Sequence, residues 1–581
     1  MVALVEALVP YVPPLVARRH AVDPAAPAAP TEERFPAAIL FADVSGFTSL
    51  ARRLAERGPA GAERLSAVLN DYFEKLLDVF TAHGGEVVAF AGDATIVAWP
   101  GLDSEDLPLL TQRAAQCGLE LMAALNGYAV AGDEVLWLRA GIGAGEVWAG
   151  TVGGVRDRWS LVVGGDPLDQ MAAAAKQARR GEVVLSPAAW TQVAGRSFAQ
   201  PRAEGCHCLL DVREPVPPRA LEPVRFSPQA VAALRCYIPR AVIEGIEAGQ
   251  IDWIASLRRV TMLFAHVSNL DYTAAGVLAR VQAATCAIQE VVDSCDGGLN
   301  QLVVDDKGTM VVAGWGLPGH AHEDDCSRAV RAGLALLARL RELGLSAAVG
   351  IATGRAFCGH RGSERRRELA VIGDTANLAA RLATSAARDT VLCDAATYQT
   401  AQPELAFHPM PPLILKGRDA PQPVYRARGE RQQSAEPAEL VLVGRRAERA
   451  MLAERLRCMG TDGGDVRVVI LEGEPGIGKS CLALDLLHLA GRLGIPAYVG
   501  AGDAVEQATP YFAWRPVFAG LFGLDHSVPA RGVERDQVLA RLEPEPELER
   551  VAPLLNAVLS LNLPDNDLTA AMSGEVRAGN T

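Results

Sequence analysis

The stretch AAILFADVSGF, residues 37–47, combines an apolar run, a single carboxylate at Asp43 and a glycine turn. A short apolar run that ends at glycine is typical of a buried β-strand. A charge in such a strand costs free energy unless a partner compensates it, so Asp43 needs a reason. A second stretch, RVTMLFAHVSNL at residues 259–270, repeats the pattern with His266 in place of Asp43. The two stretches indicate a duplicated strand in which only the first copy carries the carboxylate.

Three further segments recur in the same order in both halves of the chain. The matched pairs are HGGEVVAFAGDATIVAWPG (83–101) with CDGGLNQLVVDDKGTMVVAGWGLPG (295–319), RAGIGAGEVWAGTVGG (139–154) with AAVGIATGRAFCGHRG (347–362), and LVVGGDPLDQMA (161–172) with LAVIGDTANLAARLA (369–383). Four matches in one order are typical of an internal repeat at the scale of a domain. We therefore predict two homologous α/β domains, named copy one and copy two.

Within copy one the pattern alternates between helix and strand. Residues 62–85 predict a helix that stops at two glycines. One face of this helix carries an apolar stripe at helical spacing, made of Leu65, Val68, Leu69, Tyr72, Phe73, Leu76 and Phe80. The next segment, EVVAFAGDATIVAW at residues 86–99, reads as two strands joined at the turn AGDA, which predicts a hairpin.

The chain of 581 residues is longer than one core usually supports, so several domains are expected. Its end, SGEVRAGNT, lacks a closing element, from which we expect a piece of a longer protein. The predicted organisation is an N-terminal amphipathic helix with a Pro/Ala linker (1–35), copy one (36–230), an inter-domain linker (231–257), copy two (258–428), a polar linker (429–440) and a P-loop unit (441–581).

Composition narrows the classes of partner. Hydrophobic residues make up 49% and charged residues 22% of the chain, as in ordinary folded protein. The net charge of -13 supplies no basic field for nucleic acid or an anionic membrane. The 11 cysteines are scattered and no secretory signal precedes them, which favours reduced thiols and a cytoplasmic protein.

The apolar N-terminus, MVALVEALVPYVPPLVARR, is interrupted by Pro10, Pro13 and Pro14. A membrane span needs roughly 20 consecutive apolar residues, so these prolines argue against one. We interpret the segment as a helix that docks on the folded protein. A membrane-surface anchor is the alternative.

Polar residues at matching positions are divided between the two copies. Copy one has Asp43 and Asp93, and copy two has Asn377, Arg381 and Lys416. At the corresponding positions the alignment gives His266 and approximately Gly308 in copy two, and Leu168 and Ala172 in copy one for the first two polar residues of copy two. Two carboxylates are hard oxygen ligands suited to Mg²⁺ or Mn²⁺, and Arg and Lys suit a triphosphate. Each copy is thus predicted to hold half of one nucleotide site.

Each of these residues also has a structural interpretation. Asp43 could cap a turn, and Asp93 could occupy a hairpin turn. Arg381 could be a solvated helix charge, and Lys416, which precedes Gly417, could be an ordinary turn lysine. The functional hypothesis is preferred because the residues divide between the copies as one complementary set.

The segments FADVSGFTSL, FAGDATIVAW and VIGDTANLAARL resemble the signature segments of class III nucleotide cyclases. The tandem pair followed by an ATPase is similar to the soluble adenylyl cyclase arrangement. The resemblance implies two ferredoxin-like α/β (α+β) domains paired head to tail as a pseudo-heterodimer, with the catalytic site at their interface. It implies substrate ATP, with GTP as an alternative, and two Mg²⁺ or Mn²⁺ ions.

The same resemblance assigns roles to individual residues. Asp43 and Asp93 would be the metal ligands, Asn377 would orient the ribose, Arg381 would stabilise the transition state and Lys416 would hold the triphosphate. The backbone amides of the intervening turn would cradle phosphates, at Val44, Ser45, Gly46 and Phe47.

Two departures from the family pattern concern the base and a regulatory anion. The base-reading lysine and its acidic or threonine partner correspond to Gln301 and Ala370, which weakens the predicted choice of ATP over GTP. Lys307 is expected in the hairpin turn and not at the base. In the second, pseudosymmetric pocket, the lysine and arginine of bicarbonate-responsive relatives correspond to Ala89 and Met171. Direct activation by bicarbonate is therefore not expected.

The third unit contains VRVVILEGEPGIGKS, residues 466–480, which reads as a strand, a glycine-rich loop and the start of a helix. This context fits a P-loop that binds ATP with Mg²⁺. The preceding segment LVGRRAERAML, residues 442–452, resembles the entry of AAA+/STAND ATPases. No apolar strand ending in paired acids follows, so binding is expected rather than turnover. The predicted P-loop residues are Gly473, Gly476, Gly478, Lys479 and Ser480.

The leading hypothesis is a purine nucleotide cyclase that converts ATP to 3′,5′-cyclic AMP and pyrophosphate, with an attached regulatory ATPase module. The alternatives are a guanylate cyclase and an inactive nucleotide-binding sensor. The expected partners are the nucleotide, the paired cyclase domains and an unidentified protein that contacts the ATPase region, without nucleic acid.

Overall fold

The structure is a computed structural model of the chain. It describes residues 2–46, 50, 53–54, 59–92, 94–101, 106–130, 135–217, 219, 224, 226–247, 256–305, 308–317, 321–322, 324–414, 421–431, 444–458, 468–473, 478–502, 511–524, 531–559, 561, 563–570, 572, 577 and 580. Four predicted site residues lie outside these ranges: Phe47, Asp93, Lys416 and Gly476. The chain divides into two compact units, residues 1–431 and 432–581.

Copy one contains a mixed sheet with strand order β2-β3-β1-β5-β7-β9-β8, to which β4 and β6 add by pairing with β5. The strands are β1 (Thr31–Ser45), β2 (Glu86–Ala91), β3 (Ala94–Pro100), β4 (Tyr128–Ala129), β5 (Val135–Val155), β6 (Arg158–Gly164), β7 (Val183–Leu185), β8 (Ser197–Pro201) and β9 (His207–Val212). The helices are α4 (Pro59–Ala82), α5 (Leu107–Leu125), α6 (Asp166–Gln177) and α7 (Pro187–Val193), with 3₁₀ turns η2 (Ala194–Arg196) and η3 (Ala203–Gly205).

Copy two repeats this topology, with strand order β11-β12-β10-β13-β15-β17-β16 and β14 paired to β13. The strands are β10 (Ser256–Ser268), β11 (Gly298–Asp305), β12 (Gly308–Trp315), β13 (Ser346–Gly362), β14 (Arg367–Ile372), β15 (Thr390–Asp394), β16 (Leu405–Leu413) and β17 (Gln422–Glu430). The helices are α10 (Val277–Ser294), α11 (Asp325–Glu342), α12 (Asp374–Ser385) and α13 (Ala395–Ala401). The predicted duplication and the mixed α/β fold class are confirmed.

The helical stripe and the hairpin predicted from the sequence are also confirmed. Along α4, Val68 is half-buried and the other six predicted core residues are buried. Strands β2 and β3 form an antiparallel hairpin in which Ala91 pairs with Ala94. The first strand begins earlier than predicted, at Thr31, because its N-terminal half pairs with β5 as far as Thr151.

A matched pair of glycines lets one helix of each copy lie close to its sheet. A Cβ on Gly141 of β5 would be 2.2 Å from the carbonyl oxygen of Met171 in α6. A Cβ on Gly350 of β13 would be 2.2 Å from the amide nitrogen of Ala383 in α12. Any larger residue would therefore push the helix away from the sheet.

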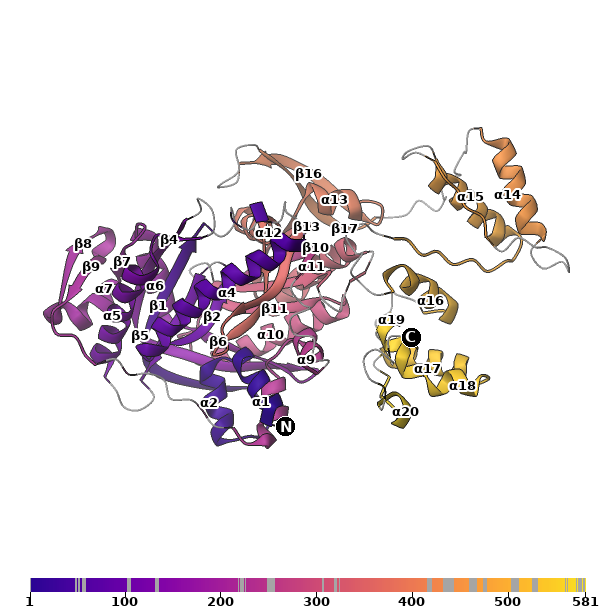
Figure 1. Cartoon of the computed structure of the whole chain (residues 1–581). Coiled ribbons are helices and arrows are strands. Elements are labelled where there is room, and N and C mark those ends of the chain that lie inside the picture. The colour runs from indigo at the N-terminus through magenta and orange to yellow at the C-terminus, as the bar shows by residue number, and fades with distance from the viewer. Residues whose placement is uncertain are drawn as a thin grey trace. The chain divides into compact units, whose positions relative to one another are not determined.

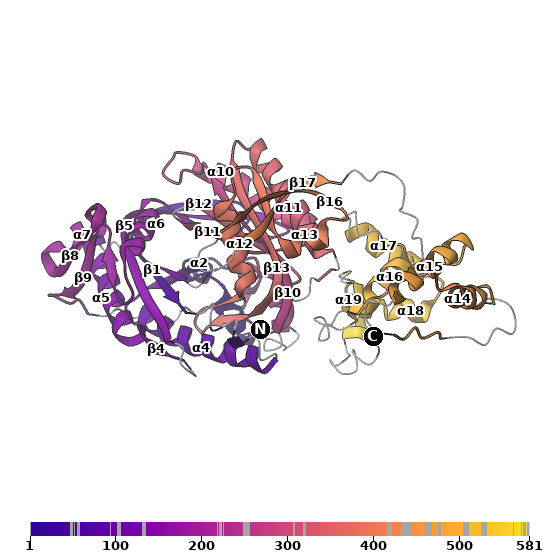
Figure 2. The ribbon, with the colours of Figure 1, turned by 90° about the horizontal axis from the view of Figure 1, so that it is seen from above.

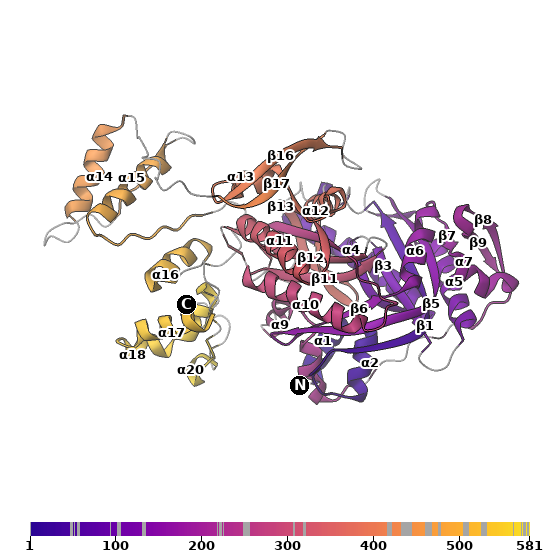
Figure 3. The same ribbon diagram turned by 180° about the vertical axis from the view of Figure 1, so that it is seen from behind.

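The two copies pack against each other through reciprocal helices. Helix α4 of copy one packs on β13 of copy two, and α10 of copy two packs on β5 of copy one. One continuous apolar core contains residues from both sheets, including Val147 of β5 and Val349 of β13. Figure 1 shows the two sheets with their helices, and Figures 2 and 3 show the same pairing of copies from above and from behind.

The N-terminal segment forms two helices instead of the single helix predicted: α1 (Val2–Leu8) and α2 (Pro14–Val22), separated by the 3₁₀ turn η1 (Val9–Tyr11). Proline cannot donate the backbone hydrogen bonds of a helix interior, which explains the break. These helices share a core with residues 228–247, which form η4 (Pro228–Ala230), α8 (Val231–Arg235) and α9 (Arg240–Glu247). The docking interpretation of the N-terminus agrees with this packing.

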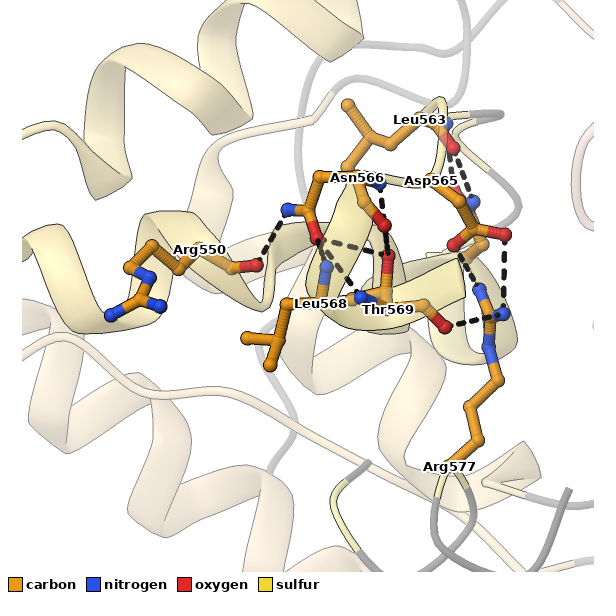
Figure 4. A network of polar contacts seen from close by, with 8 residues as sticks. Arg550, Leu563, Asp565, Asn566, Leu568, Thr569 and Arg577 are labelled. Carbon is orange, nitrogen blue, oxygen red and sulfur yellow. Dashed lines mark hydrogen bonds and ion pairs between the residues drawn. The ribbon is translucent and has the colours of Figure 1, made fainter. Parts of the chain in front are cut away.

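The second unit is helical in the residues that are described. Its elements are α14 (Arg446–Cys458), α15 (Lys479–Arg492), η6 (Phe512–Trp514), α16 (Arg515–Phe522), α17 (Arg531–Leu542), α18 (Pro546–Arg550), η7 (Ala552–Leu555), α19 (Asn556–Leu559) and α20 (Asp567–Ala570). Figure 4 shows how Asn566 begins α20, with its side chain accepting from the amides of Leu568 and Thr569 and donating to the carbonyl of Arg550. Asp565 pairs with Arg577 beside it.

The predicted strand before the P-loop is not formed in the described residues 468–473. Val468 and Ile470 are 75% and 82% exposed. A strand needs a neighbour to satisfy its backbone groups, and the described part of this unit offers none. The expected helix does form, and it begins at Lys479.

Candidate functional site

A cavity of about 350 Å³ lies between the two copies. Strand β1, the β2–β3 hairpin, β5 and α6 contribute its walls from copy one, and strands β10 to β14 with α12 contribute them from copy two. Of the predicted site residues that the structure describes, three with polar side chains line it together: Asp43, Gln301 and Asn377. The structure thus brings into one cavity residues that are more than 300 positions apart in the chain.

Asp43 lies near the end of β1, where its strand neighbours are Ala94 of β3 and Arg139 of β5. Its Oδ2 accepts from Arg139 Nε at 2.8 Å and is 2.6 Å from Nη2. The Asp43 side chain is 25% exposed, and both Asp43 and Arg139 line the cavity, so this ion pair is accessible from the cavity. Arg139 was not predicted as a site residue, because its proximity to Asp43 depends on the register between β1 and β5 and not on a local motif.

Asp93 lies outside the described residues, but its neighbours are described. It follows Gly92, whose φ of 60° belongs to a tight turn, and precedes Ala94, the strand partner of Asp43. Gly92 lines the cavity.

The strand registers test the alignment between the copies. His266 pairs with Met310 and Ala348, as Asp43 pairs with Ala94 and Arg139, so His266 is confirmed as the counterpart of Asp43. The same register makes Thr309, which precedes Met310, the counterpart of the residue before Ala94. The approximate assignment to Gly308 was therefore one position off. Copy two lacks the arginine as well, because Ala348 occupies the position of Arg139.

The helix alignment also requires correction. Helices α6 and α12 begin directly after Gly165 and Gly373, and the two helices have the same length. The counterparts of Asn377 and Arg381 are therefore Asp169 and Ala173, not Leu168 and Ala172. The doublet Gly164-Gly165 permitted the error, because either glycine could be matched to Gly373 in the sequence.

Arg381 follows Asn377 by one turn of α12 and is half-buried. Asn377 is among the residues that line the cavity, whereas Arg381 is not. The predicted pair therefore shares a helix face, but only its first member lies at the cavity wall.

The predicted base-reading side of the cavity contains an additional carboxylate. Gln301 on β11 donates from Nε2 to both oxygens of Glu368, at 3.1 and 3.2 Å. Ala370, 3% exposed, also lines the cavity, two residues along β14 from Glu368. Residues two apart on a strand share a face, so Glu368 projects on the side where Ala370 offers only a methyl group. Glu368 was not identified from the sequence.

Glu368 in turn forms an ion pair with Arg361 of β13, its cross-strand neighbour. Arg361 is 3% exposed and also donates to the carbonyl oxygen of Gly92 in copy one. A single chain of contacts therefore runs from Gln301 through Glu368 and Arg361 to the hairpin of the other copy.

The predicted phosphate-binding turn is described as far as Gly46. Val44 is buried, Ser45 is exposed, and Gly46 adopts φ +117°, a conformation that favours glycine. Residues 44–46 are not among those that line the cavity. Phe47 and Lys416 lie outside the described residues.

The pseudosymmetric part of the cavity is lined by Met171, Ala172, Ala175 and Lys176 of α6, together with apolar residues of β10 and β12. Ala89 occupies the β2 position that matches Gln301, because both residues follow a bulge and face corresponding residues of the next strand. Lys176, which was not predicted from the sequence, brings a cationic side chain to this region.

One strand of the β2–β3 hairpin begins at a buried carboxylate. Glu86 at the start of β2 is 1% exposed and pairs with Arg18 of α2. Burial raises the pKa of Glu86 to about 7, while the charge and hydrogen bond of Arg18 act in the opposite direction.

In the second unit, Gly478 precedes α15 with a left-handed φ of 96°, and Ser480 lies in the first turn of that helix. Lys479 Nζ donates to the carbonyl oxygen of Gly473 at 2.8 Å. Gly476 lies outside the described residues. A helix start with adjacent glycine, lysine and serine can bind phosphate through backbone amides and the lysine charge.

Among the described residues, no helix is long and apolar enough to cross a membrane. The same residues form no group of three or more His, Cys, Asp or Glu side chains that could hold a metal ion.

Comparison with known proteins gives two family matches. Residues 30–195 and 256–426 match the family described as "Adenylate and Guanylate cyclase catalytic domain". Residues 441–579 match the family described as "AAA ATPase domain".

Among curated proteins, the chain is 25% identical over 510 residues to adenylate cyclase type 10 of Rattus norvegicus, which covers 80% of this chain and 31% of the relative. It is 29% identical over 219 residues to adenylate cyclase 1 of Rhizobium meliloti (strain 1021), which covers 34% of this chain and 32% of the relative. The chain therefore spans about a third of the length of these relatives. Among solved structures, a class III adenylyl cyclase-like ATP-binding protein from Pseudomonas aeruginosa is similar over 64% of this chain and 85% of that chain, with 15% identity and a TM-score of 0.47.

Proposed function

The chain belongs to the family of adenylate and guanylate cyclase catalytic domains, and on that premise we propose that it is a purine nucleotide cyclase that makes 3′,5′-cyclic AMP from ATP. The observation that carries the proposal is the asymmetric cavity, which takes Asp43 from copy one and both Gln301 and Asn377 from copy two. Among the described residues the opposite half of the cavity does not repeat this set, because copy two has His266 and Ala348 where copy one has Asp43 and Arg139.

In the proposed reaction the ribose 3′-oxygen attacks the α-phosphorus. The new O3′–P bond forms as the bond from the α-phosphorus to the bridging oxygen breaks, pyrophosphate leaves, and the hydroxyl proton passes to solvent. Asn377 would orient the ribose, and Arg381 would reach the developing charge by a change of side-chain conformation. Lys416 and the backbone of Val44–Phe47 would bind phosphates.

The carboxylates fit the divalent ions that such a site requires. Asp43 is partly exposed at the cavity, and Asp93 directly follows Gly92, another lining residue, in the sequence. Mg²⁺ is usually held by one or two carboxylates together with substrate phosphates, so two aspartates suffice without a larger cluster. Two Mg²⁺ or Mn²⁺ ions held there would supply positive charge to the phosphates and acidify the 3′-hydroxyl.

Arg139 is a further candidate for phosphate binding. Its guanidinium pairs with Asp43. A guanidinium can form two parallel hydrogen bonds with phosphate as with carboxylate. We therefore assign Arg139 to the phosphate side of the substrate.

Base recognition is assigned to Gln301, Ala370 and Glu368. Gln301 has two amide hydrogens, of which one is directed to Glu368, so the other could serve N1 of adenine. A free lone pair of Glu368 could accept from the adenine amino group. A guanylate cyclase is the second candidate, because a carboxylate and an amide can also pair with the guanine edge.

The ATPase unit would bind ATP with Mg²⁺ through Lys479, Ser480 and the adjacent glycines, and would regulate the cyclase through a partner protein. We also propose the domain boundaries predicted from the sequence, the P-loop roles of these residues and a cytoplasmic location.

The test is a product assay on the purified chain with ATP or GTP and with Mg²⁺ or Mn²⁺. Cyclic AMP formation that falls at least about 100-fold in Asn377→Ala, with nucleotide binding retained, is the expected result. Absence of any cyclic product under all four combinations, with nucleotide still bound, would favour the inactive sensor.

A further inference from the structure

We propose that Arg361 of copy two is a positioning residue for the metal-binding hairpin of copy one, a proposal that rests on the cyclase function proposed above. The residue connects the base-reading side of the cavity with the β2–β3 hairpin. Its guanidinium donates to the carbonyl oxygen of Gly92 and pairs with Glu368. Gly92 immediately precedes Asp93 in the chain.

The surroundings of Arg361 hold it in one place. Its guanidinium carbon lies 4.8 Å from the ring centre of Phe90 and 5.2 Å from that of Phe73, both in copy one. The two rings are fully buried and meet edge to face. Cation–π contacts and two polar anchors leave a buried guanidinium little freedom to rotate.

A second buried arginine strengthens the same contact. The guanidinium of Arg366, from the turn before β14, lies 5.7 Å from the ring centre of Phe90 and donates to the carbonyl oxygens of Pro10 and Arg367. Phe90 is therefore approached by two cations of copy two, two residues before Gly92.

Stability of the β13–β14 hairpin does not by itself explain the buried pair. A buried ion pair is usually no more stabilising than an apolar pair of the same size, because both ions must be desolvated. Copy one offers the comparison directly, since the equivalent strand pair is Val152 with Ser160. Copy one forms the same hairpin with an uncharged pair at this position, so the ion pair of Arg361 and Glu368 is specific to copy two, whose Arg361 contacts Gly92 of the β2–β3 hairpin.

The consequence is a link between the two halves of the site. With Arg361 in place, the carbonyl of Gly92 is fixed relative to Glu368 and hence to Gln301. Without it, the turn would depend on the two strands of the hairpin alone. Positioning groups behind metal ligands commonly change metal affinity by about 10–100-fold when removed.

The test uses the full chain and the double variant Arg361→Met/Glu368→Gln, which removes both charges together and so avoids an unpaired buried ion. Arg361→Lys keeps the charge but loses the fork that reaches two acceptors. The matched control is Arg328→Met, because Arg328 is also buried and ion-paired, with Asp296 and Asp324, but does not line the cavity.

Three readouts are measured: the Mg²⁺ concentration for half-maximal cyclisation, the Mn²⁺ dependence of binding of a fluorescent ATP analogue, and hydrogen exchange of residues 86–100 without metal. For the double variant we expect about a tenfold higher metal requirement in both titrations and faster exchange in the hairpin. Arg328→Met should lower thermal stability without these shifts, and Arg361→Lys should fall between.

A double variant with wild-type metal titrations and wild-type hairpin exchange would overturn the proposal, and so would equal shifts in Arg328→Met. If the wild-type chain forms no cyclic nucleotide, the proposed function fails, while analogue binding and exchange still decide the role of Arg361. Loss of Mn²⁺-dependent binding with faster exchange would support it, and unchanged values would refute it.

Discussion

Replacing Glu86 with glutamine should stabilise the folded chain at pH 8 but not near pH 4.5. Glu86 is buried at the start of β2, and burial raises its pKa from 4.5 to about 7. The folded state therefore binds this proton more tightly than the unfolded state does. The contribution to stability is fully present below pH 4.5 and is lost as the pH rises through 7.

The size of the effect follows from the displacement of the pKa of Glu86. Moving a pKa from 4.5 to about 7 corresponds to about 3 kcal/mol of unfolding free energy once the carboxylate is fully ionised. Glutamine resembles the protonated acid and does not titrate. Arg18, which loses its partner, has a side chain that is 34% exposed and can be hydrated.

The assay is urea unfolding of the wild-type and Glu86→Gln chains from pH 4.5 to 8, followed by tryptophan fluorescence. Other titrating groups are common to both chains and cancel in the difference. That difference should grow by about 3 kcal/mol in favour of the variant between pH 4.5 and 8. A difference that stays constant across this range would refute the reasoning, because it would mean that Glu86 does not titrate there.

Three further predictions concern other parts of the molecule. Gln301→Lys should raise kcat/KM for ATP relative to GTP by about tenfold, since an ammonium group can only donate, which suits N1 of adenine but not the N1–H of guanine; an unchanged ratio would exclude Gln301 from base reading. Lys479→Ala should abolish analogue binding by the second unit and leave basal cyclisation within about twofold, as measured in parallel assays. Gly350→Ala should cost about 3 kcal/mol of unfolding free energy, because its Cβ would lie 2.2 Å from Ala383 N; unchanged urea unfolding would contradict this.

The duplicated fold was predictable because its signal is local. Apolar strands such as residues 37–47 and the stripe of α4 depend on side-chain periodicity, which the sequence displays directly. The equivalence of Asp43 and His266 followed from the same pattern, and the strand registers confirm it. The helix alignment was displaced by one residue because Gly164, and not Gly165, was matched to Gly373.

The site residues that were not predicted from the sequence act through partners that are distant in the chain. Arg139 lies opposite Asp43, 96 positions away, and Arg361 reaches Gly92, 269 positions away. No local motif encodes such distances, because they arise only when the sheets of both copies are assembled. The strand predicted before Lys479 failed for the opposite reason. Its apolar pattern is clear in the sequence, but the described residues supply no neighbouring strand.

The central claim is that one asymmetric site serves the whole pair of copies. The most direct test compares cyclic nucleotide formation by Asp43→Ala with that by His266→Ala, the same strand position in the other copy. Asp43→Ala should lower turnover by at least about 100-fold, while His266→Ala should retain most of it. Equal losses in both variants, or full activity of Asp43→Ala, would contradict the account.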